Sequence, residues 1–209
     1  MKILLTGFNS FRGVRRNPSE QVVRILAARG GSFAGVELVA AVLPTEYRAG
    51  SRKLRRLIRG NRPDAVVCLG VAPRRDAFSL ERVALNLDDE ATPDNAGVVR
   101  RARPIVRGGP DVYWSTLPLD RLLKQLRRRR IKAVISNHAG AFLCNHAFYL
   151  ARHETARRGI PCGFLHLPGT GRRPSGNRPS AARMVRAVEC CLTVLAEDWK
   201  RGKRHPRKT

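Results

Sequence analysis

The stretch DAVVCLG at residues 64–70 decides the fold of this 209-residue chain. Its unbroken apolar run, closed by a glycine, predicts a short strand. The basic segment 51–59 before it is predicted to be a helix, and the apolar residues 36–43 before that helix predict another strand. The chain therefore alternates between strands and helices around this stretch.

The alternation extends toward both ends of the chain. A short strand at 3–5 leads through a loop into a helix that starts near Asn17 and Pro18, because proline is tolerated in the first turn. Further helices are predicted at 117–130, 142–157 and 181–199, and further strands at 80–87, 133–135 and 163–165. Residues 88–109 are rich in Asp, Pro, Gly and Arg, which predicts mostly loop and at most a short hairpin.

This order of elements predicts an α/β fold. We expect residues 1–199 to form a single domain with a doubly wound, mainly parallel sheet flanked by helices on both faces. A basic C-terminal tail follows at 200–209. Functional residues in such folds gather at the carboxyl ends of the strands.

The net charge of +25 points first to an anionic partner such as nucleic acid, because Lys and Arg neutralise phosphates. However, aromatic residues make up only 6% of the chain, which leaves few platforms on which bases can stack. No recognised nucleic-acid motif occurs either. A binding protein that uses its basic surface for nucleic acid or acidic partners is therefore the alternative function, and no specific nucleic acid is predicted.

The apolar segments and the cysteines limit the location of the protein. No stretch approaches the ~20 apolar residues that span a bilayer, so no membrane partner is expected. The five cysteines are an odd number without CxxC spacing, which argues against a disulfide scaffold and a clustered zinc site. A reducing, cytoplasmic location fits this pattern best.

Cys144 is the candidate nucleophile. It follows a predicted strand and a turn of small residues, at the start of a predicted helix. The free amides and the dipole of a helix N-terminus favour a thiolate, so we expect a lowered thiol pKa, and the same amides can donate to an oxyanion. Cysteine is also among the most frequently buried residues, so an inert core thiol is the alternative.

His166 is the candidate base, because it ends the strand predicted at 163–165 and an imidazole there can take the thiol proton. His146 lies two residues beyond Cys144 on the predicted helix and should point about 200° away, which makes it a poor base. Spacing does not exclude His138, in the turn before the helix.

Glu81 is the candidate for the group that orients the imidazole. It lies within the strand predicted at 80–87, beside apolar residues. An acid near a neighbouring strand end can hold the imidazole tautomer and stabilise its charged form. A salt bridge to Arg82 or Arg74 is the simpler interpretation of the same residue, and spacing alone does not decide between them.

Several ordered blocks of the sequence resemble the cysteine-type pyroglutamyl peptidases, also called pyrrolidone-carboxylate peptidases. The blocks lie at residues 4–18, 81–86, 93–95, 115–118, 136–146 and 164–168. The resemblance implies a catalytic triad of Glu81, Cys144 and His166, in agreement with the candidates above. It further implies a cysteine exopeptidase that removes an N-terminal pyroglutamyl residue from peptides through a thioester acyl-enzyme, with no metal or organic cofactor.

The resemblance also implies the substrate site and the assembly. Phe8 and Phe11 would flank the lactam ring, and Asn17 would organise their loop. Phe142 and Leu143 would complete the substrate-binding residues. The resemblance suggests homodimers or homotetramers, in which the adjacent cysteines at 190–191 either approach their symmetry mates or stay reduced and buried.

The chain departs from the family pattern near the expected site. Arg12 stands where members commonly have glycine, Ala91 where they usually have arginine, and Ala141 where they usually have a hydroxyl residue. Residues 169–173 lack the usual aromatic and acidic continuation. We expect these changes to affect specificity and rate more than fold, and we expect the arginines at 12, 74 and 75 to help keep Cys144 ionised.

Overall fold

The computed structural model describes all residues except 31, 34, 170–171, 174–175, 178 and 205–209. The helices and strands alternate along much of the chain, as the sequence predicts. The strands of the main sheet are β1 (Lys2–Phe8), β2 (Ser32–Phe33), β3 (Val36–Leu43), β4 (Ala65–Ala72), β5 (Phe78–Leu85), β8 (Val112–Trp114), β9 (Ala133–His138) and β10 (Cys162–Pro168).

The sheet is mainly parallel, which confirms the predicted architecture. Its order is β2-β3-β1-β4-β10-β5-β8, and β9 pairs with β5. Strands β3, β1, β4 and β10 run parallel to one another, whereas β5 is antiparallel to β10. The reversal was not predicted; it follows from the short connection 73–77 between β4 and β5, because a parallel crossover needs a dozen or more residues.

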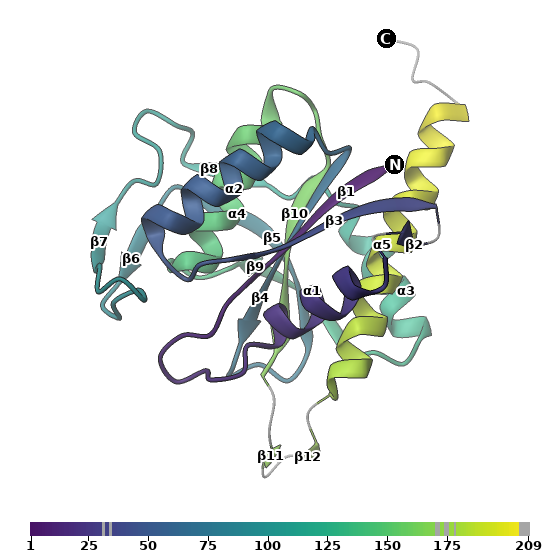
Figure 1. The fold of residues 1–209 in the computed structure, drawn as a ribbon, viewed down its shortest axis with the longest axis horizontal. Helices are drawn as coiled ribbons and strands as arrows, with labels where there is room; N and C mark the ends of the chain where they lie inside the picture. Colours follow the sequence, from purple (N-terminus) through teal and green to yellow (C-terminus); the bar gives the residue numbers. More distant parts are fainter. Residues whose placement is uncertain (31, 34, 170–171, 174–175, 178, 205–209) are drawn as a thin grey trace.

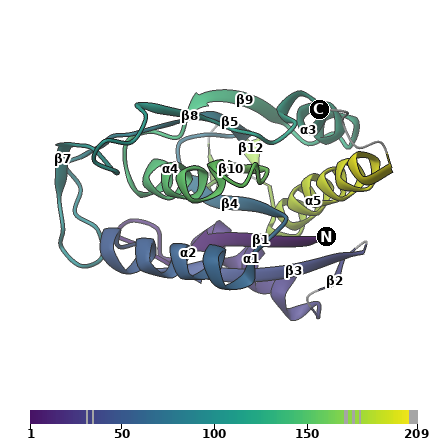
Figure 2. The same ribbon diagram turned by 90° about the horizontal axis from the view of Figure 1, so that it is seen from above.

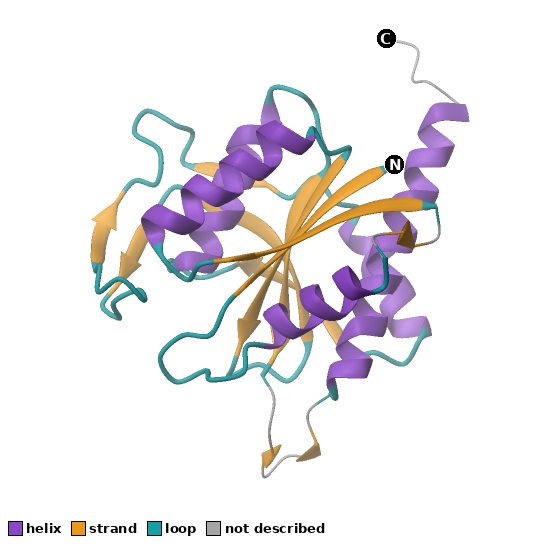
Figure 3. Cartoon of the chain, viewed as in Figure 1, coloured by secondary structure: helices purple, strands orange, loops and turns teal. Residues whose placement is uncertain are grey.

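Helices cover both faces of the sheet (Figures 1 and 3). They are α1 (Pro18–Ala28), α2 (Tyr47–Asn61), α3 (Leu119–Arg128), α4 (Leu143–Ala156) and α5 (Ala181–Arg204). Residues of α1, α3 and α5 share one hydrophobic cluster with the sheet, and residues of α2 and α4 share the other. Figure 2, seen from above, shows the strands stacked side by side between these helices.

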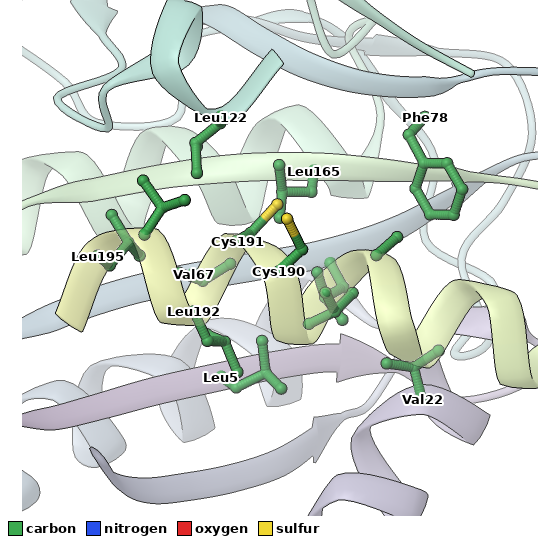
Figure 4. Packing of buried hydrophobic residues seen from close by; sticks show 14 of the residues in the cluster. Leu5, Val22, Val67, Phe78, Leu122, Leu165, Cys190, Cys191, Leu192 and Leu195 are labelled. Carbon is green, nitrogen blue, oxygen red and sulfur yellow. The ribbon is translucent and has the colours of Figure 1, made fainter. Parts of the chain in front are cut away.

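Helix α5 packs its apolar side against the sheet. Figure 4 shows Leu192 beside Leu5 of β1, with the sulfurs of Cys190 and Cys191 among the core residues. Both cysteines are buried and unpaired. Within the chain both therefore pack in the core without a disulfide partner.

Some predicted boundaries differ from the observed ones. Helix α5 continues to Arg204, so part of the predicted tail at 200–209 is helical, and residues 205–209 lie outside the described part of the chain. The predicted loop at 88–109 contains the short hairpin of β6 (Asp88–Glu90) and β7 (Arg100–Arg103), and the loop after β10 contains β11 (Arg172–Arg173) and β12 (Gly176–Asn177). None of the described helices is long and apolar enough to cross a bilayer.

Candidate active site

Glu81 and His166 are joined by a hydrogen bond on one face of the sheet. Glu81 of β5 lies opposite Phe164 of β10, so His166, two residues further along β10, faces the same way. His166 Nδ1 lies 2.8 Å from Glu81 Oε1, and both residues are buried. A carboxylate only accepts hydrogen bonds, so Nδ1 carries the proton and Nε2 is left as the basic nitrogen.

Cys144 approaches the same place from α4. It is the second residue of that helix, after the N-cap Phe142, as the sequence predicts. A Cβ built on Gly70 of β4 would lie 2.7 Å from Cys144 Sγ, and Gly70 lies opposite His166 in the β4–β10 ladder. The sulfur therefore lies against Gly70, the residue of β4 that pairs with His166. No hydrogen bond between Sγ and His166 occurs within the described residues.

The thiol of Cys144 is not pre-ionised, contrary to the sequence-based expectation. Burial raises its pKa to about 12, and the negative charge of Glu81 adds to the increase. The positive charge of Arg75 lowers this pKa, but it does not offset the other two effects. At neutral pH the nucleophile is therefore a thiol that must lose its proton to a base during the reaction.

Arg75 is a site residue that the sequence analysis did not assign to the triad. Its Nη1 donates to Glu81 Oε1 at 2.6 Å, the same oxygen that binds His166. The salt bridge expected as an alternative for Glu81 thus exists, but with Arg75; Arg82 donates instead to Asn137 Oδ1. Arg12 and Arg74 are exposed loop residues. Both roles of Glu81, salt-bridge partner and imidazole partner, are therefore realised together.

The residue after the nucleophile fixes α4 to the sheet. Asn145 is fully buried, and its side-chain amide forms hydrogen bonds with the backbone at the end of β5 and just beyond it. Its Oδ1 accepts from Leu85 N at 2.9 Å, and its Nδ2 donates to the carbonyls of Leu85 and Leu87. These bonds fix the first turn of α4 relative to β5, the strand of Glu81. The sequence showed Asn145 only as part of a motif, because its partners lie about sixty residues earlier in the chain.

The other two histidine candidates are engaged elsewhere. His146 is buried, with Nδ1 at 2.9 Å from Asp88 Oδ2 and Nε2 at 2.8 Å from Ser51 Oγ, so it belongs to a separate polar network, in line with its predicted direction. His138 is exposed at the end of β9, where its Nδ1 accepts from the Gly140 amide. No group of three His, Cys, Asp or Glu residues that could hold a metal occurs in the described part of the chain.

The residues implied for substrate binding differ in exposure. Phe11 and Phe142 are partly exposed, whereas Phe8 and Leu143 are buried in the cluster under α4. Asn17 is buried too, and it organises the loop after β1. Its Oδ1 accepts from Ser19 N as the N-cap of α1, and its Nδ2 donates to the carbonyl of residue 9.

The departures from the family pattern that the structure describes lie at exposed or half-buried positions. Arg12 and Ala91 are exposed, and Ala141 is half-buried with its carbonyl accepting from the amide of residue 89. Of the altered segment 169–173, residues 170 and 171 lie outside the described part of the chain. Hence the altered positions that the structure describes leave the Glu81–His166 pair intact.

Comparisons with known proteins place nearly the whole chain among described relatives. The family model for pyroglutamyl peptidase matches residues 1–195. The pyrrolidone-carboxylate peptidase of Gloeobacter violaceus is 40% identical over 203 residues, which cover 95% of this chain and 98% of that protein. That of Pyrococcus furiosus is 39% identical over 170 residues, covering 80% of this chain and 81% of that protein.

A solved structure gives the same result in three dimensions. A mutant pyrrolidone carboxyl peptidase of Pyrococcus furiosus superposes with a TM-score of 0.89 at 33% identity, covering 95% of this chain and all of that one. The match of a family model to nearly the whole chain, together with these relatives, leads to one assignment. The chain belongs to the pyroglutamyl peptidase family.

Proposed function

We propose that Cys144, His166 and Glu81 carry out the cysteine-type pyroglutamyl peptidase activity of this family. The observation that carries the proposal is the buried hydrogen bond between His166 Nδ1 and Glu81 Oε1, beside the sulfur of Cys144 at Gly70. The alternative of a nucleic-acid or acidic-partner binding protein gains no support from these relatives.

The first step forms the acyl-enzyme. Nε2 of His166 takes the proton of Cys144 as the sulfur attacks the carbonyl carbon of the N-terminal pyroglutamyl residue. The amides in the first turn of α4 have no acceptor within the helix and are available to the oxyanion. His166 then gives its proton to the departing α-amine, which leaves a thioester on Cys144.

The second step releases the product. His166 takes a proton from water, the oxygen attacks the thioester, and the thiol is regenerated as free pyroglutamate leaves. Glu81 keeps the proton on Nδ1 and stabilises the imidazolium that forms in each step. The raised pKa of Cys144 is consistent with this order, because the proton leaves the thiol only during attack.

The substrate would be a peptide with an N-terminal pyroglutamyl residue. The lactam ring is flat and uncharged, so partly exposed aromatic rings suit it. Phe11 and Phe142 are the candidates for direct contact, with Phe8 and Leu143 supporting them from the core and Asn17 holding the loop. Assembly into homodimers or homotetramers stays a prediction, to be tested by analytical ultracentrifugation. The five unpaired cysteines support a reducing, cytoplasmic location.

The test is the hydrolysis of a chromogenic pyroglutamyl amide. The wild type is expected to release the chromophore, and Cys144→Ser is expected to lose nearly all activity. Cys190→Ala is the matched control, because this cysteine is buried on the opposite face of the sheet and its loss should leave turnover largely unchanged. Equal rates for the wild type and Cys144→Ser would overturn the assignment of the nucleophile.

A further inference from the structure

One carboxylate oxygen of Glu81 accepts hydrogen bonds from both a guanidinium and an imidazole. Arg75 and His166 both donate to Oε1 of Glu81, at 2.6 and 2.8 Å. The side chain of Glu81 is 0% exposed and that of Arg75 is 36% exposed. Oε2 of Glu81 has no hydrogen-bond partner among the described residues. Arg75 thus reaches from the loop after β4 to the buried carboxylate and competes with the imidazole for the same lone pairs.

We propose that Arg75 is a positioning residue of the peptidase: it holds the Glu81 carboxylate in place and keeps the His166 imidazole neutral until the thiol proton arrives. The proposal rests on the proposed roles of Cys144, His166 and Glu81. Arginine suits this task because its guanidinium stays charged at every pH at which an enzyme works.

The reasoning follows from charge and distance. The two donors share one oxygen, so the guanidinium nitrogen and Nδ1 lie no more than about 5.4 Å apart, a separation at which like charges repel appreciably. A protonated imidazole at this position would place two positive charges on one carboxylate. Arg75 therefore disfavours a resting imidazolium–carboxylate pair, in which His166 could not act as a base. It also makes the imidazolium formed after attack a stronger acid toward the leaving amine.

The other groups around the imidazole do not supply this charge. They are Glu81 from β5, which binds the imidazole, and Cys144 from α4. Cys68 from β4 interacts with the thiol of Cys144. Burial raises the pKa of Cys68 to about 11, so both thiols are neutral near pH 7. Of the groups named here, only Arg75 carries a permanent positive charge.

The chain offers a matched control next to Arg75. Arg74 lies in the same connection between β4 and β5, carries the same charge and is exposed. Arg74→Gln and Arg75→Gln therefore change the net charge equally, but only the second removes the hydrogen bond to Glu81. Arg75→Lys keeps the charge while losing the planar guanidinium.

The experiment measures kcat/KM for a chromogenic pyroglutamyl amide from pH 5 to 9 in the wild type and these three variants. The acid limb is the part of the pH profile in which kcat/KM falls as the pH is lowered. In Arg75→Gln we expect this limb to move upward by about one pH unit. On the limb, kcat/KM is then roughly tenfold lower than in the wild type at the same pH, and it recovers at higher pH. In Arg75→Lys and Arg74→Gln we expect the limb within about 0.3 units of the wild type. Circular dichroism and thermal unfolding verify that each variant is folded.

Three results would overturn the proposal. The first is an unmoved acid limb in folded Arg75→Gln, even with lower activity, since this is what a purely structural ion pair predicts. The second is an equal shift in Arg74→Gln, which would indicate general surface charge. The third is a full shift in Arg75→Lys, a test that stands even if the Gln variant does not fold. The two proposals fail in different ways. A wild type that does not hydrolyse the amide would refute the proposed function, whereas an active wild type with an unmoved limb in Arg75→Gln would refute only the role of Arg75.

Discussion

Gly70→Ala should displace the nucleophile without unfolding the protein. The Cβ of an alanine at this position would lie 2.7 Å from Cys144 Sγ and 2.7 Å from Cζ of Phe164. Non-bonded heavy atoms pack at about 3.5–4.0 Å, so each contact must open by roughly 1 Å. The Cys144 side chain is short and its helix is anchored by Asn145, so the sulfur cannot move away freely.

Two magnitudes follow from this clash. Overpacking of a core costs about 1–3 kcal/mol, which is less than the roughly 5–15 kcal/mol of a typical domain, so we expect the variant to fold. A displacement of about 1 Å at a reacting atom costs on the order of 10²-fold in rate. We therefore expect kcat/KM for the chromogenic pyroglutamyl amide to fall about a hundredfold, with a moderate loss of stability in urea unfolding.

Gly60→Ala is the matched control. Gly60 is an exposed residue near the end of α2, and a Cβ there would meet nothing within 4 Å. This change should leave kcat/KM unaltered and raise stability by up to about 1 kcal/mol, because alanine is the better helix former. A folded Gly70→Ala protein with kcat/KM within threefold of the wild type would refute the placement of the sulfur against β4.

Three more predictions test the site and its surroundings. Glu81→Gln should lower kcat/KM by about 10²–10⁴, because an amide can favour the wrong imidazole tautomer, and a loss below tenfold would contradict the role of Glu81. Since the pKa of Cys144 is raised to about 12 from an ordinary value of 9.0, its alkylation by iodoacetamide should still rise above pH 9, and a plateau from pH 7 upward would show a pre-formed thiolate. The unfolded chain loses this proton first, so stability should fall between pH 9 and 12, and by less in Cys144→Ala. His146→Asn should cost about 2–4 kcal/mol in urea unfolding, because buried Asp88 loses its imidazole partner, whereas His153→Asn on the more open side of α4 should cost less; equal costs would contradict this account.

Much of the architecture could be predicted because it depends on local patterns. The apolar run at 64–70 and the apolar stretch of β3 mark strands wherever they lie in space. Pro18 after Asn17 marks a helix start through the fixed φ of proline and the side-chain cap, and α1 begins there. The position of Cys144 in the first turn of α4 follows in the same way from a strand, a turn of small residues and a helical pattern.

The direction of β5 could not be predicted from local patterns. A strand has the same composition whichever way it runs, and only the short connection 73–77 and the pairing with β10 fix its direction. This direction brings Glu81 beside His166, although 85 residues separate them in the sequence. Spacing alone therefore left Glu81 open between a salt bridge and a partner of the imidazole.

The sequence by itself determined the alternating α/β fold, the helix-terminal cysteine and the set of candidate acids and bases, because these depend on periodicity and on the chemistry of single residues. Only the tertiary structure decided that Arg75 and His166 share one oxygen of Glu81, that His146 pairs with Asp88, and that the thiol of Cys144 has a raised pKa. The physical reason is that ionisation and hydrogen bonding depend on burial and on neighbours brought together by folding. The sign of the Cys144 shift illustrates this, since burial and the negative charge of Glu81 raise the pKa by more than the positive charge of Arg75 lowers it.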